Sequence, residues 1–381
     1  MKVVIAPDSF KGSLSGFEVC DIVERGILQV FPAAEIAKIP ISDGGEGLVR
    51  LLLKALDGES VKIKVHDPLS RVIETEYGIL EGNTAVIEMA AASGLPLLKK
   101  AEQNPLLTNT YGTGEMIVDA VKQKGCQKIL LGIGGSATND GGMGMASALG
   151  IKFLGENHEE LEPCGQNLGC IKTIDLSQVD PVFSEVEFII ACDVDNPLCG
   201  HQGAAHIYGP QKGANKDMVV QLDDGLAHLG RLFEEMAGSD LIDRKGIGAA
   251  GGLALPLVAV YQATLKSGLE VVLDAIKFDE LIKGADLIVT GEGKTDRQST
   301  MGKVISGIGR RGKNQQIPVI VVSGALEGGY EPLCEHGITA AFATYRNAKS
   351  LEWHIENAEQ LLYDTIVNIF RLFSITGWKP K

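Results

Sequence analysis

Short apolar runs that end in polar loops recur along the chain, and most of them lead into a helical spacing of apolar residues. The first run covers residues 2–6, and its loop leads into a helical pattern that extends to Val30. Similar runs cover residues 35–40, 129–133, 188–191, 286–290, 318–323 and 339–343. Because strands that alternate with helices are typical of parallel sheets, this pattern predicts an α/β protein.

A different pattern covers residues 61–89. Three runs of alternating apolar and polar residues, separated by Pro, Gly and Asn, indicate antiparallel strands. Parallel-type strands lie on both sides of this region in the sequence, so the simplest arrangement is one sheet interrupted by an insertion. We therefore predict a discontinuous domain of residues 1–60 and 285–381, an inserted α/β domain of residues 61–284 with a mixed sheet, and an active site in the cleft between them.

Length, composition and charge agree with two folded domains and exclude some classes of protein. The chain has 381 residues, of which 45% are hydrophobic, and a formal net charge of -14. This charge argues against binding to nucleic acid or to an anionic membrane, because both depend on attraction between basic patches and phosphate. The apolar runs are shorter than the ~18 residues of a membrane span, so we expect a cytoplasmic protein.

Cysteine usage favours reduced thiols. The seven cysteines form no CxxC pair, which argues against a disulfide framework. One cluster, Cys192, Cys199, His201 and His206, is dense enough to suggest a metal site. Its spacing matches no zinc-binding pattern, so we expect no structural zinc there.

The stretch from Lys128 to Gly144, KILLGIGGSATNDGGMG, carries the strongest chemical signal. A buried strand leads into a turn that combines five glycines with Ser136, Thr138, Asn139 and Asp140. Glycines let a bulky anion approach the main-chain N–H groups, and a carboxylate among them suggests a phosphate whose charge is shared with a metal ion. The pattern predicts a phosphate-binding turn, with Asp140 as a candidate metal ligand.

Two alternatives stay open for this stretch. The glycines could form a strand-to-helix turn that binds nothing. Gly132, Gly134 and Ala137 also fit the dinucleotide-binding fingerprint, with Glu156 about twenty residues downstream in the place of a ribose ligand. Asp140 would repel a pyrophosphate, and the first strand of the chain lacks the fingerprint, so this oxidoreductase reading ranks second.

Other strand exits also carry polar residues, at the edge where parallel sheets bind ligands. The loop after the first strand holds one cation, Lys11, together with polar residues that could be ligands or helix caps. The loop after the second strand, Ser42–Gly47, could bind a metal or sugar-like hydroxyls. A threonine-rich segment precedes a helix expected at 116–122 and could bind an anion. Their candidate residues are Asp8, Ser9, Lys11, Ser13, Ser15, Asp43, Gly44, Gly45, Thr110, Gly112 and Thr113.

Later exits add carboxylates. Asp193 and Asp195 follow the strand at 188–191 and are candidates for a Mg²⁺ site or a general base. The exit after residue 290 contains GKT but lacks the first glycine of a phosphate-binding Walker motif, and it leaves Glu292, Asp296, Gln298 and Lys303 as candidates. A second glycine-rich turn, residues 246–252, is expected to permit close packing, and residues 351–373 are expected to form one amphipathic helix.

Ordered motifs along nearly the whole chain resemble those of the bacterial class I glycerate kinases. They are APDSFKGSLS from Ala6, SDGGEG from Ser42, TYGTGE from Thr110, GIGGSATNDGG from Gly132, NPL from Asn196, GPQKGA from Gly209, GAAGGL from Gly248 and TGEG from Thr290. The resemblance implies ATP-dependent phosphorylation of D-glycerate with Mg²⁺, giving 2-phosphoglycerate or, less commonly, 3-phosphoglycerate. It also implies a flavodoxin-like domain built from both chain ends.

Combined with this resemblance, the chemistry of phosphoryl transfer gives each candidate a role. The turn from Gly134, with Gly135, Ser136, Thr138 and Asn139, is assigned to the phosphates of ATP, together with Thr110, Gly112 and Thr113. Lys11, Lys303 and Asp296 are assigned to catalysis, and Asp193 to the general base or, with Asp140, to the metal. Substrate contacts are assigned to Asp8, Ser9, Ser13, Asp43, Gly44, Gly45, Glu292 and Gln298.

The sequence departs from the family pattern at two positions and leaves one further alternative. Lys294 and Arg297 stand where the family usually has arginine and serine, so no role is assigned to them. A sensor that binds a sugar acid without turnover is the alternative outside the enzymes, although so many charged strand exits favour catalysis. No pattern in the sequence indicates an oligomeric state.

Overall fold

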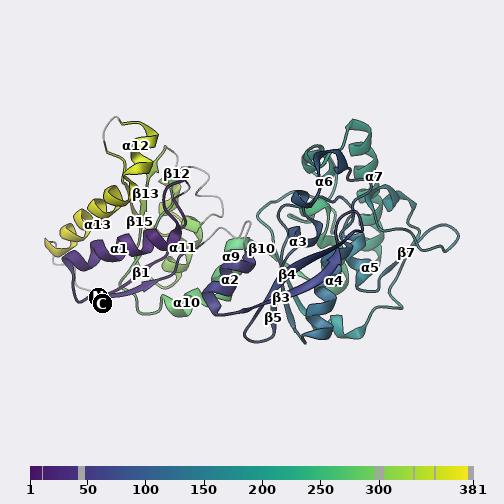
Figure 1. Cartoon of the computed structure of the whole chain (residues 1–381), viewed down its shortest axis with the longest axis horizontal. Coiled ribbons are helices and arrows are strands. Elements are labelled where there is room, and N and C mark those ends of the chain that lie inside the picture. The colour runs from purple at the N-terminus through teal and green to yellow at the C-terminus, as the bar shows by residue number, and fades with distance from the viewer. Residues whose placement is uncertain are drawn as a thin grey trace. The chain divides into compact units, whose positions relative to one another are not determined.

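A computed structural model describes residues 1–10, 12–41, 48–296, 299, 304–328, 331–346 and 349–375, apart from the side chain of Lys54. The chain forms two compact units (Figure 1). The end-built unit contains Met1–Asp43 and Val272–Lys381, and the central unit contains Gly44–Val271. The sequence analysis placed the boundaries at residues 60 and 285 instead. It therefore assigned residues 44–60 to the end-built unit and residues 272–284 to the central unit.

The end-built unit contains a five-stranded sheet in which every neighbouring pair is parallel. The strand order is β15-β13-β11-β1-β2, the flavodoxin-like order that the resemblance implies. The strands are β1 (Lys2–Ile5), β2 (Glu35–Lys38), β11 (Leu287–Thr290), β13 (Val319–Ser323) and β15 (Ile338–Ala343). Their central members are buried on both faces, as their continuous apolar runs predict.

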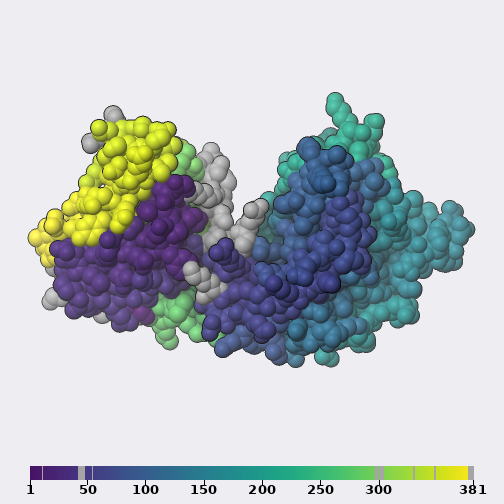
Figure 2. All heavy atoms as spheres, in the orientation of Figure 1, coloured from purple at the N-terminus to yellow at the C-terminus, as the bar shows by residue number. Residues whose placement is uncertain are grey.

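Helices cover both faces of this sheet. On one face, α1 (Gly16–Val30) and α13 (Ala358–Ile375) share a core with Val3, Ile5, Val289 and Val322. The C-terminal residues adjoin the N-terminal ones in Figure 2, where the yellow and purple surfaces meet. On the other face, α11 (Val304–Asn314) packs through Gly312 against Ile288 and Val319. The remaining elements are α9 (Gly268–Ala275), which crosses the boundary, α10 (Phe278–Leu281), α12 (Leu351–Glu356), β12 (Lys294–Thr295) and β14 (Ala325–Leu326).

The expected single helix at 351–373 was wrong. The structure has two helices, α12 and α13, which are separated at Asn357. The main-chain and side-chain amides of Asn357 both donate to the Trp353 carbonyl. Asparagine competes in this way for main-chain partners, which explains the break.

The central unit contains a six-stranded mixed sheet in the order β10-β9-β6-β5-β4-β3. The pairs from β3 to β5 are antiparallel, as predicted, but β5 then pairs with β6 in parallel. Residues 61–89 therefore extend the same sheet as the strand that precedes the glycine-rich turn. The strands are β3 (Glu59–His66), β4 (Val72–Leu80), β5 (Thr84–Glu88), β6 (Lys128–Gly132), β9 (Glu187–Ala191) and β10 (Thr264–Lys266).

One large core binds most helices of the central unit to this sheet. The helices are α2 (Leu48–Leu56), α3 (Ala90–Ser93), α4 (Tyr111–Val118), α5 (Met143–Ala148), α6 (Ala204–Tyr208), α7 (Lys216–Ala237) and α8 (Ala254–Tyr261); β7 (Lys152–Leu154) and β8 (Thr173–Asp175) form a small ribbon. In the described part of the chain, no helix combines the length and the apolar character needed to cross a membrane.

Candidate functional site

The turn after β6 exposes two glycines and buries the polar residues that follow. Gly134 and Gly135 are exposed, whereas Ser136 is 8% exposed and Thr138 and Asn139 are fully buried. A Cβ on Gly134 would meet nothing within 4 Å, and Gly135 has a φ of +73°, which side-chain-bearing residues rarely adopt. The main chain therefore reaches the surface at Gly134 and Gly135 with no side chain to obstruct an anion.

The strands beside β6 end level with this turn. Gly132 pairs with Glu88 of β5 on one side and with Ala191 of β9 on the other. Since Gly134 and Asp193 each lie two residues beyond a paired position, they leave neighbouring strands at the same edge. This is the edge at which open α/β sheets bind ligands.

Two carboxylates lie at this edge. Asp193 is exposed, and its Oδ1 accepts a hydrogen bond from the Gly268 N–H at 2.8 Å. Glu88 accepts bonds from the N–H groups of Leu48 and Val49, at 3.3 and 3.4 Å, at the start of α2. The helix N-terminus favours this negative charge. The sequence analysis named Asp193 but missed Glu88, because it read Glu88 as the end of a strand.

Asp140 lies below the turn and is fully buried. Its Oδ2 accepts hydrogen bonds from the main-chain and side-chain donors of Thr110, at 2.8 and 2.7 Å, and from the Gly144 N–H at 3.1 Å. Its Oδ1 accepts from the Gly142 N–H at 3.2 Å. Burial raises the pKa of the Asp140 carboxyl, and these donors oppose that rise. Both oxygens thus hold the turn together, and neither faces solvent.

Asp140→Asn is expected to lower the free energy of unfolding by about 2–4 kcal/mol, because one oxygen becomes an amide that faces N–H donors. Urea denaturation of the variant and of the wild type measures this difference. Asp195→Asn, which changes an exposed carboxylate that pairs with Lys245 at 3.0 Å, serves as the control. Equal stability of Asp140→Asn and the wild type would contradict the supporting role.

The threonine-rich segment lies inside the fold. The helix expected at 116–122 begins earlier, at Tyr111, so Gly112 and Thr113 belong to its first turn. Both are buried, and the Thr113 hydroxyl bonds to the Ser93 hydroxyl at 2.7 Å. A Cβ on Gly112 would lie 1.8 Å from the His66 carbonyl oxygen. In this structure, Gly112 and Thr113 pack, and Thr110 supports Asp140, rather than facing a ligand.

The second glycine-rich turn packs closely against the first. Gly251 accepts a hydrogen bond from the Gly141 N–H at 2.9 Å. A Cβ on Gly251 would lie 2.3 Å from the Thr138 carbonyl oxygen, so only glycine permits this approach.

The side chain of Lys212 contacts the turn from the interior of the unit. It follows Pro210 and Gln211 and is fully buried. Its Nζ donates to the Ser136 hydroxyl at 2.7 Å and to the Thr138 carbonyl at 2.6 Å. The sequence analysis quoted its motif without giving it a role. The partners of Lys212 lie more than seventy residues away along the chain, so the only signal was a lysine among small residues.

A second group of candidates lies in the end-built unit, where β1 and β11 end side by side. Asp8 follows β1, Glu292 follows β11, and the Asp8 N–H donates to the Gly291 carbonyl at 2.9 Å. In this strand order the connections from β1 and β11 leave to opposite faces of the sheet. Such a switch point is the usual ligand site of flavodoxin-like sheets.

Hydroxyl groups orient Glu292 at this position. Its Oε1 accepts from the hydroxyl of Ser299 and, at 3.2 Å, from that of Thr295. Thr295 also bonds to the hydroxyl of Ser323 at 2.7 Å. Ser323 ends β13, which pairs with β11, so hydroxyls from the end of β13 and from the segment after β11 fix this carboxylate. The sequence analysis did not predict a role for Thr295, Ser299 or Ser323.

The remaining candidates of this unit have local partners or are not described. Ser9 donates its N–H to Asp8 at 2.6 Å, Ser13 donates its hydroxyl to Phe10, and Ser15 caps α1 in a capping box with Glu18. Asp296 lies 3.7 Å from Lys294, which also pairs with Glu327 at 2.9 Å. Lys11, Asp43, Gly44, Gly45, Arg297, Gln298 and Lys303 lie outside the described residues.

The dinucleotide interpretation is not supported by the geometry. Its fingerprint must open a helix, but α5 begins at Met143, six residues after Ala137. Glu156 lies exposed in the loop after β7, which belongs to the small ribbon and not to the parallel sheet.

The described residues contain no group of three or more His, Cys, Asp and Glu side chains that could hold a metal ion. Cys192 donates to the carbonyl of Val194 at 3.3 Å, and the rings of His201 and His206 contact one another.

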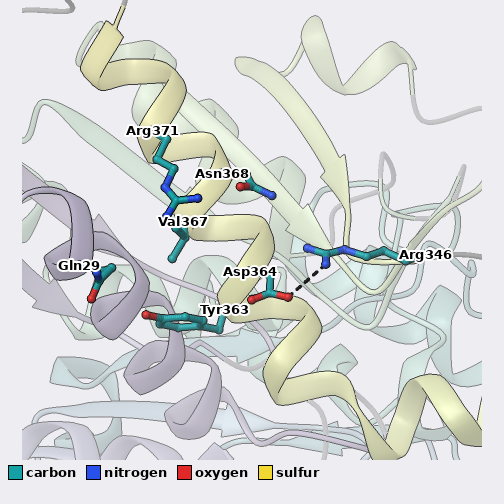
Figure 3. A pocket seen from close by; sticks show the side chains of 7 residues that line it. All are labelled: Gln29, Arg346, Tyr363, Asp364, Val367, Asn368 and Arg371. Carbon is teal, nitrogen blue, oxygen red and sulfur yellow. Dashed lines mark hydrogen bonds and ion pairs between the residues drawn. The ribbon is translucent and has the colours of Figure 1, made fainter.

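A pocket of about 290 Å³ lies between α1 and α13 in the end-built unit (Figure 3). It is lined by Gln29, Arg346, Tyr363, Asp364, Val367, Asn368 and Arg371. Arg346 pairs with Asp364 at 3.1 Å across it. No candidate from the sequence lies there.

Comparison with known proteins assigns the family. The model of the glycerate kinase family matches residues 3–374. The chain is 46% identical over 368 residues to a glycerate kinase of Halalkalibacterium halodurans (96% of this chain, 97% of the relative) and 41% identical over 377 residues to the glycerate 2-kinase of Escherichia coli K12 (99% and 98%).

A solved structure agrees with this result. The crystal structure of a Salmonella typhimurium LT2 protein provisionally assigned as glycerate kinase 2 superposes with a TM-score of 0.85 at 39% identity, covering 99% of each chain. The flavodoxin-like sheet and the exposed glycine turn agree with these matches. The chain belongs to the glycerate kinase family.

Proposed function

We propose that this chain transfers the γ-phosphoryl group of ATP to D-glycerate and releases ADP and 2-phosphoglycerate. The observation that carries the proposal is the pair of exposed glycines at the carboxyl end of β6, in register with Asp193 on the neighbouring strand. The family supports a kinase that uses ATP, and the name of the Escherichia coli relative supports the 2-hydroxyl as the acceptor.

In the central unit, Gly134, Gly135 and Ser136 receive the phosphates of ATP. Thr138, Asn139 and Asp140 act from below this surface, because all three are fully buried. Asp193 is exposed at the same edge, where a carboxylate can take the hydroxyl proton as the oxygen attacks the γ-phosphorus. The bond from that phosphorus to the bridging oxygen of ADP then breaks.

In the end-built unit, Asp8 and Glu292 bind the hydroxyl groups of the acid. Carboxylates accept hydrogen bonds from hydroxyls strongly, and Glu292 is held for this by Thr295 and Ser299. Lys11 and Lys303 are proposed as the cations for the phosphoryl group or for the carboxylate of glycerate, and Asp296 as a further catalytic residue. A cation is required because substrate and nucleotide are both anionic.

Mg²⁺ fits the exposed edge better than the buried carboxylate. Mg²⁺ is usually held by phosphate oxygens, by water and by one or two carboxylates. Both oxygens of Asp140 already accept protein hydrogen bonds, so Asp193 is the proposed ligand in the alternative in which it does not take the proton. Bound there, the ion would neutralise charge on the phosphates.

An assay of ADP release tests the proposal. Purified protein with ATP and Mg²⁺ is expected to release ADP at rates typical of kinases, about 1–100 per second, when D-glycerate is added. L-glycerate and lactate are the matched controls, since the first inverts the acceptor carbon and the second lacks one hydroxyl. ADP release that does not depend on D-glycerate would contradict the proposal.

The comparisons do not support the two other functions that the sequence left open. The two relatives cited above are named as kinases, not as oxidoreductases or sensors. Binding of D-glycerate without ADP release would favour a sensor instead.

A further inference from the structure

Lys212 is the one buried cation among the side chains that the structure describes, at 2% exposure. Moving a charge from water into the interior is costly unless nearby groups compensate. Lysine is therefore rarely buried without a direct carboxylate partner. A buried lysine behind a candidate phosphate site calls for an explanation in terms of that site.

The contacts of Lys212 all lead to the turn. Its ammonium donates to the Ser136 hydroxyl and to the Thr138 carbonyl, and both acceptors are neutral. Asp140 attracts the ammonium through space, but its carboxylate is occupied by Thr110, Gly142 and Gly144. Among the described side chains, no carboxylate shares a hydrogen bond with Lys212, so its charge lies beneath the turn without a direct ion pair.

Other polar groups in the same interior also lack partners. The side-chain amide of Asn139 and the hydroxyl of Thr138 have no hydrogen-bond partner among the described residues. Native proteins rarely leave such groups unsatisfied. Packing alone does not explain a polar interior of this kind, in which a cation, an amide and a hydroxyl lie under two bare glycines.

We propose that Lys212 is a positioning residue for nucleotide binding, which fixes Ser136 and Thr138 and places a positive charge behind Gly134 and Gly135. The inference rests on the proposed function, in which those glycines receive the phosphates of ATP. Because the charge lies in the low-dielectric interior, its attraction for a phosphate at the surface of the turn is weakly screened. Lys212 acts on the phosphates through the turn and does not need to touch them.

The protonation of Lys212 gives the inference a distinctive signature. Burial lowers the pKa of Lys212 to about 7, and the negative charge of Asp140 opposes this shift. Asp140 is the charged group that acts on Lys212 from the turn, and the segment Pro210–Lys212 adds no other. A phosphate at the turn favours the charged form, so nucleotide affinity should fall as pH rises through about 7.

Nucleotide affinity of three lysine variants tests the inference. ATP binding with Mg²⁺ is measured by calorimetry from pH 6 to pH 9, and KM values for ATP and D-glycerate are measured with kcat. Lys212→Met removes the charge, and Lys212→Arg keeps it at every pH. Lys216→Met, which changes an exposed lysine at the start of α7, is the control.

At pH 6.5, Lys212→Met is expected to weaken ATP binding by about 10- to 100-fold, the size of a lost charge interaction, with the KM for D-glycerate within about twofold. Lys212→Arg should restore ATP binding at least in part and lose the pH dependence. The difference between wild type and Lys212→Arg removes the titration of ATP itself. Lys216→Met should behave as the wild type.

Unchanged ATP binding in Lys212→Met, or a pH dependence in Lys212→Arg equal to that of the wild type, would overturn the inference. If Lys212→Met does not fold, the pH profiles of the wild type and Lys212→Arg decide the question. ATP binding with the expected pH dependence but without turnover of D-glycerate would contradict the proposed function and still support the role of Lys212.

Discussion

Gly134→Asp is expected to raise the KM for ATP by about 100-fold while the protein stays folded. A carboxylate within ~4 Å of a phosphate costs a few kcal/mol at an effective dielectric constant of about 20, which corresponds to two orders of magnitude or more in affinity. Nothing lies within 4 Å of a Cβ at Gly134, so the side chain can be accommodated without displacing its neighbours. Steady-state kinetics with varied ATP and thermal unfolding measure the two quantities.

Gly169→Asp is the matched control. Gly169 is also exposed, belongs to the same unit, and has nothing within 4 Å of its Cβ position. This variant should keep the wild-type KM for ATP, because Gly169 does not belong to the turn. If both variants raise the KM equally, or if neither does, the assignment of the turn to the phosphates is wrong.

Glu292→Gln is expected to lower kcat/KM for D-glycerate by about 100-fold, because a charge-assisted hydrogen bond to a hydroxyl contributes about 1.5–3 kcal/mol. Asp8→Asn should have an effect of similar size, since Asp8 leaves the neighbouring strand. Glutamine retains the oxygen that accepts from Thr295 and Ser299, so the network can persist. Kinetics with varied D-glycerate at saturating ATP provide the measurement.

Glu356→Gln changes an exposed carboxylate of the same unit, at the end of α12, and should leave the kinetics unchanged. The KM for ATP should also stay near the wild-type value in Glu292→Gln. A larger effect on ATP than on D-glycerate would reassign Glu292 to the nucleotide.

The strands were predictable because their apolar runs are continuous and their exits are polar. The pattern around Lys2–Ile5 and Leu287–Thr290 identified two parallel strands, and the order of elements then led to one interrupted sheet. The turn at Gly134 was predictable for the same local reason, since closely spaced glycines after a strand indicate a turn.

Burial inside a loop was not predictable from local pattern. Thr138 and Asn139 look like ligand donors in the sequence, yet both are buried beneath the glycines. Lys212 looks like a surface lysine, because its contacts with Ser136 and Thr138 arise only when distant segments fold together. Gly112 and Thr113 were expected before the helix, as part of its threonine-rich entrance. They belong to its first turn instead, because tertiary packing overrides the low helix propensity of glycine.

Phosphorus NMR of the purified protein with ATP, Mg²⁺ and D-glycerate tests the central claim most directly. We expect a new phosphomonoester resonance that is split by a single proton, because the carbon at the 2-position carries one hydrogen. Splitting by two protons would identify the 3-hydroxyl as the acceptor and correct the proposed product. Intact ATP in the presence of folded protein and D-glycerate would contradict the assignment of this chain as a glycerate kinase.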